Sequence, residues 1–400
     1  MKAAVIGAGE ESLYTINKAH EYGIEIIALD GNPKAEGLDA ADTAMAVDIS
    51  KEDAVIGALK KEQPDFVLTA PIGRYLTTVG AVNDALGLPG ISREMAVLCT
   101  DKFLFHQRMQ EQKLRMGRCY YAEGGRITDV SGRIYQGEKE IGEELLLTFP
   151  AILKPRYGSG SRGIYILNSR KQLMEALEAV SGEAYVLEEC AQGEEYGADG
   201  AVIGEQFYLV LLRKKENTPL PARQAVGYFS VSPSDGLWQE VQEYMEKTVV
   251  CLGLKECLFH ADIIKTERGL FAVEMSARPS GHNLHNFFTP LCTGVDVVEE
   301  YIRHRIGLPC HFETEKVRPM LIHYFDLQGK VKQVPNQEEV QEALSVKLVE
   351  WKCRIREGEE LAPVTDGHSL MGRGFFVLEG GDKRELRRQA EKVKSFFQTE

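Results

Sequence analysis

The stretch at residues 258–283 reads LFHADIIKTERGLFAVEMSARPSGHN, and its charged side chains decide how the whole chain is interpreted. Two apolar runs flank the turn-like tetrad TERG, a pattern typical of an antiparallel β-hairpin. If the turn is centred near Arg268, Asp262 lies opposite Glu274, because each is six residues from that centre. Side chains that oppose each other on one face lie about 4.5–5.5 Å apart. The sequence therefore predicts two facing carboxylates.

Two like charges in this arrangement repel each other unless a cation lies between them. Strand periodicity places Ser276 and Arg278 on the same face as Glu274. Two carboxylates beside a hydroxyl and an arginine suit Mg²⁺ that bridges to a phosphate. The alternative is an exposed hairpin face with ordinary charges, but the apolar residues between the two acids favour burial of the opposite face.

A second stretch, AILKPRYGSGSRGI at residues 151–164, predicts two strands joined by a glycine-rich tip. Glycine lets backbone N–H groups turn toward a ligand and lets a phosphate approach closely. Ser159, Ser161 and Arg162 add hydrogen-bond donors, and Lys154 lies at the strand end, where it can reach the same anion. The alternative interpretation of this stretch is an ordinary surface turn.

A third stretch, AYVLEECAQGEEYGADGAV at residues 184–202, predicts a strand that ends in the acidic pair Glu188-Glu189. The end of a strand offers backbone groups to the edge of an adenine. The carboxylate of Glu195, further along, can accept hydrogen bonds from ribose hydroxyls. Taken alone, this stretch could equally be a charged turn.

Composition narrows the class of protein. The chain has 400 residues, of which 44% are hydrophobic and 27% charged, with a formal net charge of −13. This length predicts two or three domains, and the acidic balance argues against a nucleic-acid partner. The N-terminus lacks the apolar run of a signal peptide, and no apolar run is long enough to span a membrane. Eight scattered cysteines favour free thiols in the cytoplasm.

The order of predicted elements indicates a mixed fold. Strands at 2–8, 24–29 and 65–69 alternate with helices at 12–22 and 52–62, which predicts a parallel sheet covered by helices. A helix is expected from Thr100 to about Lys113, with Thr100 as its cap. Further strands and helices follow to the end of the chain, so the predicted class is α/β combined with α+β.

Four features follow one another along the chain: a lysine on a helix (Lys102), a strand lysine before a glycine loop (Lys154, 158–163), an acidic strand end, and a hairpin with paired acids and Arg278. This series resembles the ATP-grasp superfamily. The resemblance is strongest over residues 96–281. It implies a Rossmann-like pre-ATP-grasp domain at 1–95, an ATP-grasp domain at 96–308 with a lid at about 115–190, and a small mixed α/β domain at 309–400.

The resemblance also implies ATP and Mg²⁺ as cofactors, with Mn²⁺ as an alternative ion. Where the family usually has asparagine, this chain has Ser276, a weaker ligand that leaves the number of metal ligands open. The roles implied by the resemblance are phosphate or nucleotide binding by Lys102, Lys154, Gly158, Ser159, Gly160, Ser161, Glu188, Glu189, Cys190, Ala191 and Glu195, metal binding by Asp262, Glu274 and Ser276, catalysis by Arg278 and Lys154, and substrate binding by Arg74, Arg278 and His282.

The activity implied is that of a carboxylate–amine ligase acting on small molecules, with an acyl-phosphate intermediate and amino acids as the leading substrates. A purine-biosynthetic ligase is the alternative of the same fold. Its substrate, a phosphorylated ribonucleotide, would need more basic residues in the domain at 1–95, where Arg74 and Arg93 are the only arginines. A regulatory nucleotide-binding module without turnover is the alternative of another class. The resemblance also makes a homodimer an open expectation.

Overall fold

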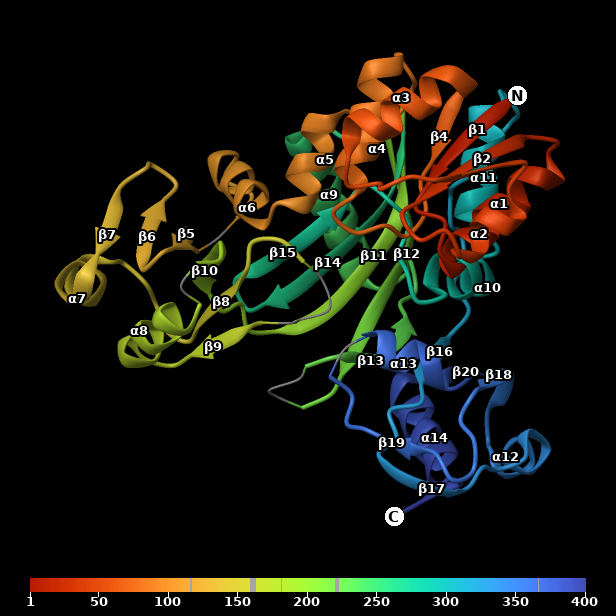
Figure 1. Ribbon diagram of the computed structural model, residues 1–400. Helices are drawn as coiled ribbons and strands as arrows, with labels where there is room; N and C mark the ends of the chain where they lie inside the picture. The colour runs from red at the N-terminus through yellow and green to blue at the C-terminus, as the bar shows by residue number, and fades with distance from the viewer. Residues whose placement is uncertain (116, 159–162, 181, 220–222, 366) are drawn as a thin grey trace.

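A computed structural model of the protein describes the chain except for residues 116, 159–162, 181, 220–222 and 366. Within the described residues, the strands form sheets of four, six, eight and three strands. Figure 1 shows the N-terminal sheet at the upper right, the six-stranded sheet at the left and the C-terminal segment at the bottom. No described helix is long and apolar enough to cross a bilayer.

The N-terminal sheet is parallel, with strand order β3-β2-β1-β4. Its central strands are buried on both faces, which explains why they are continuous apolar runs. The predicted strands and helices of this region are confirmed to within two residues. The elements here are β1 (Lys2–Ile6), η1 (Glu10–Ser12), α1 (Leu13–Glu21), β2 (Glu25–Asp30), α2 (Glu36–Ala40), β3 (Thr43–Ala46), α3 (Glu52–Glu62), β4 (Phe66–Leu68), α4 (Leu76–Leu86) and α5 (Arg93–Thr100).

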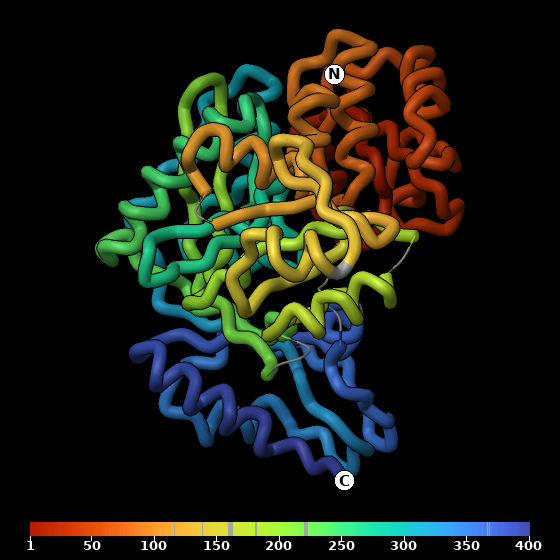
Figure 2. Tube along the Cα trace, turned by 90° about the vertical axis from the view of Figure 1, so that its left-hand side faces the viewer, coloured from red at the N-terminus to blue at the C-terminus, as the bar shows by residue number. Residues whose placement is uncertain are grey.

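The six-stranded sheet is antiparallel, with strand order β7-β6-β5-β10-β8-β9. The predicted pair of strands around the glycine-rich tip is confirmed, because β8 pairs with β9. Figure 2 shows this part of the chain, in yellow, in front of the central sheet. The elements are β5 (Cys119–Glu123), β6 (Arg126–Asp129), β7 (Ile134–Gln136), α7 (Gly137–Lys139), η2 (Glu140–Glu144), β8 (Ala151–Pro155), β9 (Tyr165–Leu167), α8 (Arg170–Ala179) and β10 (Tyr185–Glu189).

The eight-stranded central sheet is antiparallel and has the order β15-β14-β11-β12-β13-β16-β20-β18. One of its faces packs against the buried side of a helix (α9) that carries Trp238, Val241 and Met245. The elements are β11 (Glu194–Ile203), β12 (Gln206–Asn217), β13 (Ala225–Ser230), α9 (Gly236–Leu252), β14 (Cys257–Thr266), β15 (Gly269–Ser276), η3 (Leu284–Phe288), α10 (Thr289–Thr293) and α11 (Val297–Arg305).

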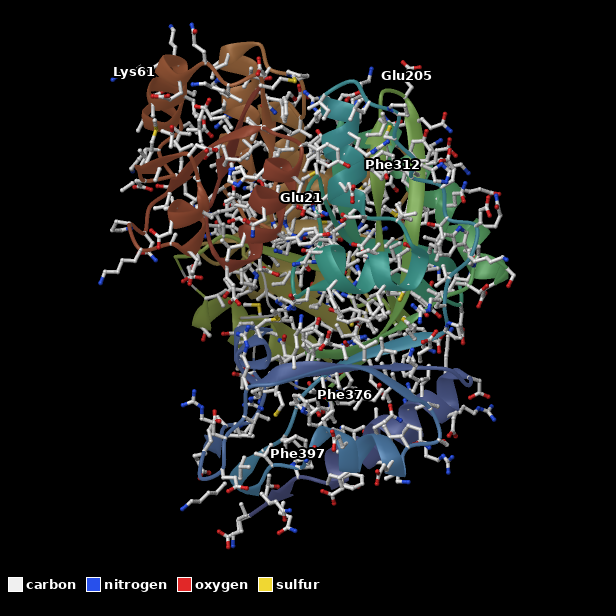
Figure 3. The ribbon with its side chains drawn as sticks, turned by 90° about the vertical axis from the view of Figure 1, so that its right-hand side faces the viewer. Glu21, Lys61, Glu205, Phe312, Phe376 and Phe397 are labelled. Atoms are coloured by element: carbon white, nitrogen blue, oxygen red, sulfur yellow. The ribbon has the colours of Figure 1, made fainter. Side chains whose placement is uncertain are left out.

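The C-terminal segment continues the central sheet, because β13 pairs with β16. Its apolar core includes Phe376 and Phe397, which are labelled in Figure 3. The proposed domain limits at residues 95 and 308 stay predictions. The elements are β16 (Met320–Tyr324), β17 (Gly329–Gln333), α12 (Gln337–Ala343), β18 (Lys347–Cys353), β19 (Glu360–Leu361), α13 (Gly367–Arg373), β20 (Gly374–Glu379), α14 (Lys383–Ser395) and β21 (Gln398–Thr399).

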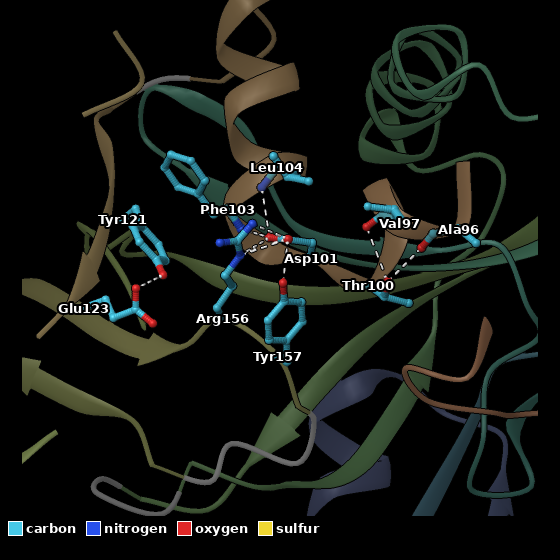
Figure 4. Close-up of polar contacts among 10 residues, drawn as sticks. All are labelled: Ala96, Val97, Thr100, Asp101, Phe103, Leu104, Tyr121, Glu123, Arg156 and Tyr157. Carbon is cyan, nitrogen blue, oxygen red and sulfur yellow. Dashed lines mark hydrogen bonds and ion pairs between the residues drawn. The ribbon is translucent and has the colours of Figure 1, made fainter. Parts of the chain in front are cut away.

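The helix α6 (Lys102–Glu111) begins at a different cap from the one expected. Asp101, not Thr100, is its N-cap, and its carboxylate accepts hydrogen bonds from the backbone N–H groups of Phe103 and Leu104. The same carboxylate accepts hydrogen bonds from Arg156 at 2.6–2.9 Å (Figure 4). Thr100 instead ends α5 and donates to the carbonyl of Ala96. Asp101 therefore fixes the start of α6 against the end of β8.

We expect Asp101→Ala to lower the free energy of unfolding by about 2–3 kcal/mol, because the helix loses its cap and Arg156 loses a buried anion. Thr100→Ala is the matched control and should cost about 0.5 kcal/mol or less. Urea denaturation of the two variants measures both values. Equal losses of stability would contradict the assignment of the cap.

Candidate functional site

A pocket of about 250 Å³ lies where the segment after β4, the start of α6 and the end of β15 meet. These segments are far apart in the sequence, and the fold brings them together at one end of the central sheet. The pocket contains charges of both signs. Six of the predicted site residues line it, namely Arg74, Lys102, Gly158, Glu274, Ser276 and Arg278.

Lys102 is the first residue of α6, so the positive end of a helix and a side-chain cation lie at the same place. Its Nζ donates a hydrogen bond of 2.6 Å to the carbonyl of Gly158, which lies three residues beyond the end of β8. Burial lowers the pKa of Lys102, and the nearby carboxylate of Glu274 opposes that shift. This cation is therefore held in the pocket beside the start of the glycine-rich tip.

Lys154, on β8, is almost completely buried and forms an ion pair with Glu188 of β10. The other carboxylate oxygen of Glu188 accepts a hydrogen bond of 2.6 Å from Arg115. His106 lies 3.3 Å from that oxygen, and its other ring nitrogen lies 2.7 Å from Arg115. The guanidinium of Arg115 covers the ring of Phe271, with 4.6 Å between Cζ and the ring centroid. We call Lys154, Glu188, Arg115 and His106 the buried quartet.

The electrostatics of the buried quartet keep Glu188 ionised. Burial alone would raise the pKa of Glu188, but Lys154, His106 and Arg115 together hold it far below its usual range. Burial, reinforced by Arg115, lowers the pKa of His106 well below its ordinary value. The quartet therefore contains two cations around one carboxylate and a neutral imidazole, and it carries a surplus of positive charge.

The sequence analysis did not predict Arg115 or His106 as parts of the site. Arg115 lies 73 residues from Glu188 in the chain, and no local pattern marks that contact. His106 follows Lys102 by four residues on the same helix, which places both on one helix face. That spacing is the signal that could have identified His106.

The acidic strand end has a mixed environment. The backbone N–H of Cys190 donates to the carbonyl of Pro150. The carboxylate of Glu195 accepts hydrogen bonds from Asn217 at 2.9 Å and forms an ion pair of 2.5 Å with Arg223. The adenine contacts predicted for Glu188, Glu189, Cys190 and Ala191 and the ribose contact predicted for Glu195 stay predictions. Four further predicted residues of the tip, Ser159, Gly160, Ser161 and Arg162, lie outside the described residues.

The hairpin of β14 and β15 places Asp262 directly opposite Glu274, as predicted. The turn and the strand pairing that produce this register differ from those assumed from the sequence. The turn is tighter, since Thr266 pairs with Gly269, and a β-bulge then leaves Val273 without a paired residue on β14. The bulge shifts the register by one residue, so the two acids still meet.

The carboxylate of Asp262 also has a partner that the sequence did not suggest. Its Oδ2 lies 2.6 Å from Nζ of Lys215 on β12, and its Oδ1 lies 3.4 Å from Nε2 of His260. Burial would raise the pKa of Asp262, but Lys215 outweighs burial and lowers it. The expected repulsion between the two acids is therefore relieved by a lysine before any metal arrives.

The oxygen donors at this position fit Mg²⁺. Glu274 and Ser276 line the pocket, and Asp262 lies opposite Glu274 across the hairpin. Carboxylate and hydroxyl oxygens are the ligand types that this ion prefers. No group of three His, Cys, Asp or Glu side chains in the described part of the chain could hold a metal by itself. Any such ion would therefore need Ser276, water or phosphate oxygens as well.

The fold places two of the three predicted substrate residues in the pocket lining and the third outside it. Arg74 and Arg278 line the pocket, whereas His282 is not among its lining residues. Arg278 donates a hydrogen bond of 2.7 Å to the carbonyl of Pro279, and burial lowers its pKa. The backbone N–H of His282 donates to the carboxylate of Glu11, which belongs to η1. This hydrogen bond connects the segment after β15 to the N-terminal part of the chain.

We expect Glu188→Gln to lower the free energy of unfolding by about 3 kcal/mol at neutral pH, because two buried cations lose their shared anion. The pKa of folded Glu188 lies below the ordinary value of 4.5. Its contribution is therefore complete above pH 4.5 and is lost as the pH falls below that value. The stability difference from wild type should shrink in acid. Glu189→Gln is the control, with a cost of about 0.5 kcal/mol or less, and a pH-independent difference for Glu188→Gln would contradict the assignment.

Comparison with known proteins agrees with this arrangement. The family model of the ATP-grasp domain matches residues 147–285. The carbamoyl phosphate synthase large chain of Clostridium beijerinckii is 24% identical over 288 residues, which are 69% of this chain and 26% of that protein. The chain therefore spans about a quarter of the length of this relative.

Two solved structures share the fold over nearly the whole chain. An L-amino acid ligase from Bacillus licheniformis has a TM-score of 0.77 and 16% identity, and the match covers 99% of this chain and 97% of that one. An N5-carboxyaminoimidazole synthetase from Staphylococcus aureus, complexed with ADP, has a TM-score of 0.74 and 14% identity, with coverage of 98% and 96%. Residues 147–285 therefore match the ATP-grasp domain, and the two solved structures share the fold of nearly the whole chain.

Proposed function

We propose that the protein is an ATP-dependent carboxylate–amine ligase that acts on amino acids. It would form an amide bond through an acyl phosphate and release ADP and orthophosphate. The observation that carries this proposal is the pocket in which Lys102, Glu274 and Arg278 meet. The likeness to an L-amino acid ligase and to a synthetase complexed with ADP supports it.

In this proposal ATP lies between the six-stranded sheet and the central sheet. Lys102 and Lys154 bind phosphates, and Glu188–Ala191 and Glu195 bind the nucleoside. Asp262, Glu274 and Ser276 would hold Mg²⁺, which when bound would neutralise phosphate charge during transfer. The buried quartet supports this role, because Glu188 orients Lys154 and the surplus positive charge favours an anion nearby.

The chemical step would be an in-line transfer of the γ-phosphoryl group to a carboxylate oxygen. Arg278 lies at the pocket wall next to Glu274 and Ser276, and its planar guanidinium can bind the acyl phosphate with two hydrogen bonds. The amine then attacks the acyl carbon, the C–O bond to phosphate breaks, and orthophosphate leaves. The amine releases a proton in this step, and the leaving orthophosphate can take it up. Arg278 stabilises the charge that develops on the oxygen atoms.

The distribution of cations favours an amino acid over a phosphorylated ribonucleotide. Of the two arginines in residues 1–95, only Arg74 lines the pocket. Arg93 forms an ion pair of 2.9 Å with Glu52 on the exposed surface. Residues 1–95 would therefore offer a substrate phosphate one arginine in the pocket, and a single arginine binds a dianion weakly. This is why the purine-biosynthetic alternative takes second place.

We expect Glu274→Gln to abolish ATP-dependent release of orthophosphate while the melting temperature changes little, because the acid faces the pocket and Lys215 already compensates Asp262. Glu267→Gln, on the exposed turn of the same hairpin, is the matched control and should keep full activity. The assay uses Mg²⁺·ATP with pooled amino acids, and then single ones. Near-normal turnover of Glu274→Gln would contradict the placement of the metal, and a wild-type protein that binds ATP without turnover would support a regulatory module.

We expect Lys102→Met to weaken ATP affinity about 10- to 100-fold, since a charge-assisted bond to phosphate contributes about 1.5–3 kcal/mol. Lys171→Met, on the exposed face of α8, is the control and should leave the affinity unchanged. Isothermal titration calorimetry with ATP measures both. An affinity of Lys102→Met equal to that of wild type would remove Lys102 from the phosphate site.

A further inference from the structure

The face of the central sheet that carries Asp262 and Glu274 continues as a row of polar residues beyond these two acids. Strand register places Asp199 of β11 opposite His260 of β14, two residues along the strand from Asp262. Arg213 of β12 lies opposite Gly197 on the same face. Ser280 and His285, from the segment after β15, lie next to Asp199 and complete the group. We call Asp199, Arg213, His260, Ser280 and His285 the inner cluster.

The inner cluster is built around a buried ion pair. Arg213 is fully buried and pairs with Asp199, which is 2% exposed. Nδ1 of His260 lies 3.3 Å from Asp199 on the other side. The guanidinium has room because its strand neighbour is a glycine: a Cβ at Gly197 would lie 3.3 Å from Cζ of Arg213. The ring of Tyr228 covers the guanidinium, with 5.0 Å between Cζ and the ring centroid.

Part of the hydrogen-bonding capacity of this cluster is unused. Nη2 of Arg213 faces Oδ2 of Asp199, and Ser280 and His260 also contact the Asp199 carboxylate. Nε and Nη1 of Arg213 have no partner within the described residues. Each buried polar group without a partner costs about 1–3 kcal/mol. Several such groups in one place indicate a polar ligand that completes them.

His285 adds an acceptor to the same place. Its Nδ1 contacts the carbonyl oxygen of Ser280, so Nδ1 carries the proton and donates it. Burial lowers the pKa of His285 to about 4, and the ring is therefore neutral near neutral pH. Its Nε2 then presents a lone pair, and that atom has no partner within the described residues. The cluster thus offers donors from Arg213 beside acceptors from Asp199 and His285.

We propose that the inner cluster is a second substrate site and that its ligand is a free α-amino acid, which supplies the amine of the ligation. Arg213 binds the carboxylate of this ligand, and Asp199 with Nε2 of His285 binds its ammonium group. An arginine with two free N–H groups can bind a carboxylate with two hydrogen bonds, and a carboxylate and a neutral imidazole nitrogen are acceptors for an ammonium group. This inference rests on the proposed ligase function, and it adds the residues that recognise the amine substrate.

The position of the inner cluster fits a nucleophile. Arg278 lines the pocket and also interacts electrostatically with both Asp199 and Asp262. It therefore lies near both the proposed phosphate site and the inner cluster. An amine held by Asp199 and His285 would then lie close to the acyl phosphate that Arg278 binds.

The test measures KM for the amine substrate and for ATP in wild type and in Arg213→Lys, with Arg268→Lys on the exposed turn as the matched control. Arg213→Lys keeps the charge but loses the fork of donors. We expect KM for the amino acid to rise about 10-fold or more while KM for ATP stays within about twofold. Amides of the same amino acid, which lack the carboxylate, should be poor substrates for wild type.

Ser280→Ala keeps the inference testable if Arg213→Lys fails to fold. It removes a hydroxyl that contacts the carboxylate of Asp199, so the melting temperature should fall only slightly, whereas KM for the amino acid should rise because Asp199 is held less firmly. Wild-type turnover together with an unchanged amino-acid KM in the folded variants would overturn the inference and leave the ligase function intact. If wild type has no turnover, the ligase proposal fails. The inner cluster is then tested by the rise in melting temperature that the amino acid causes in the presence of Mg²⁺·ADP. If wild type shows no such rise, or if Ser280→Ala shows the same rise as wild type, the inner cluster is not an amino-acid site.

Discussion

The antiparallel register of β14 against β15 is the constraint on which the site depends. The tight turn and the bulge at Val273 together bring Asp262 opposite Glu274 and Ser276 opposite His260. A slip of one residue would move these side chains to the apolar face that packs on α9. The register of β11 and β12 against β14 then adds Lys215, Asp199 and Arg213 to the same face. One sheet face therefore carries the acids, their counter-charges and the inner cluster.

Two of the proposed site charges, Lys154 and Asp262, are balanced by the protein before any ligand binds. Lys154 pairs with Glu188, and Asp262 pairs with Lys215. This pairing offsets the cost of burying the charges, since an unpaired buried charge destabilises the fold by several kcal/mol. It also means that phosphate and metal must exchange with existing partners. Glu274 and Lys102, which line the open pocket, are the charges that a ligand meets first.

The predictable part of the site is the part coded by short stretches of sequence. The facing acids follow from one hairpin, and Lys154 follows from the strand before the glycine-rich tip. Thr100 was mistaken for the cap because Asp101 is also a good cap and only its contact with Arg156 distinguishes the two. Arg115, Lys215, Arg213 and Asp199 were missed, because each is defined by a partner on another strand or helix and no local pattern records that pairing.

Transfer of oxygen between substrates tests the central claim most directly. The protein is incubated with Mg²⁺·ATP and an amino acid whose carboxylate carries ¹⁸O at both oxygens, and the orthophosphate is analysed by mass spectrometry. An acyl phosphate requires that a carboxylate oxygen leaves with the phosphorus, because the amine displaces orthophosphate at carbon. We predict one labelled oxygen in each orthophosphate formed. Unlabelled orthophosphate during amide formation would contradict activation of a carboxylate by phosphoryl transfer.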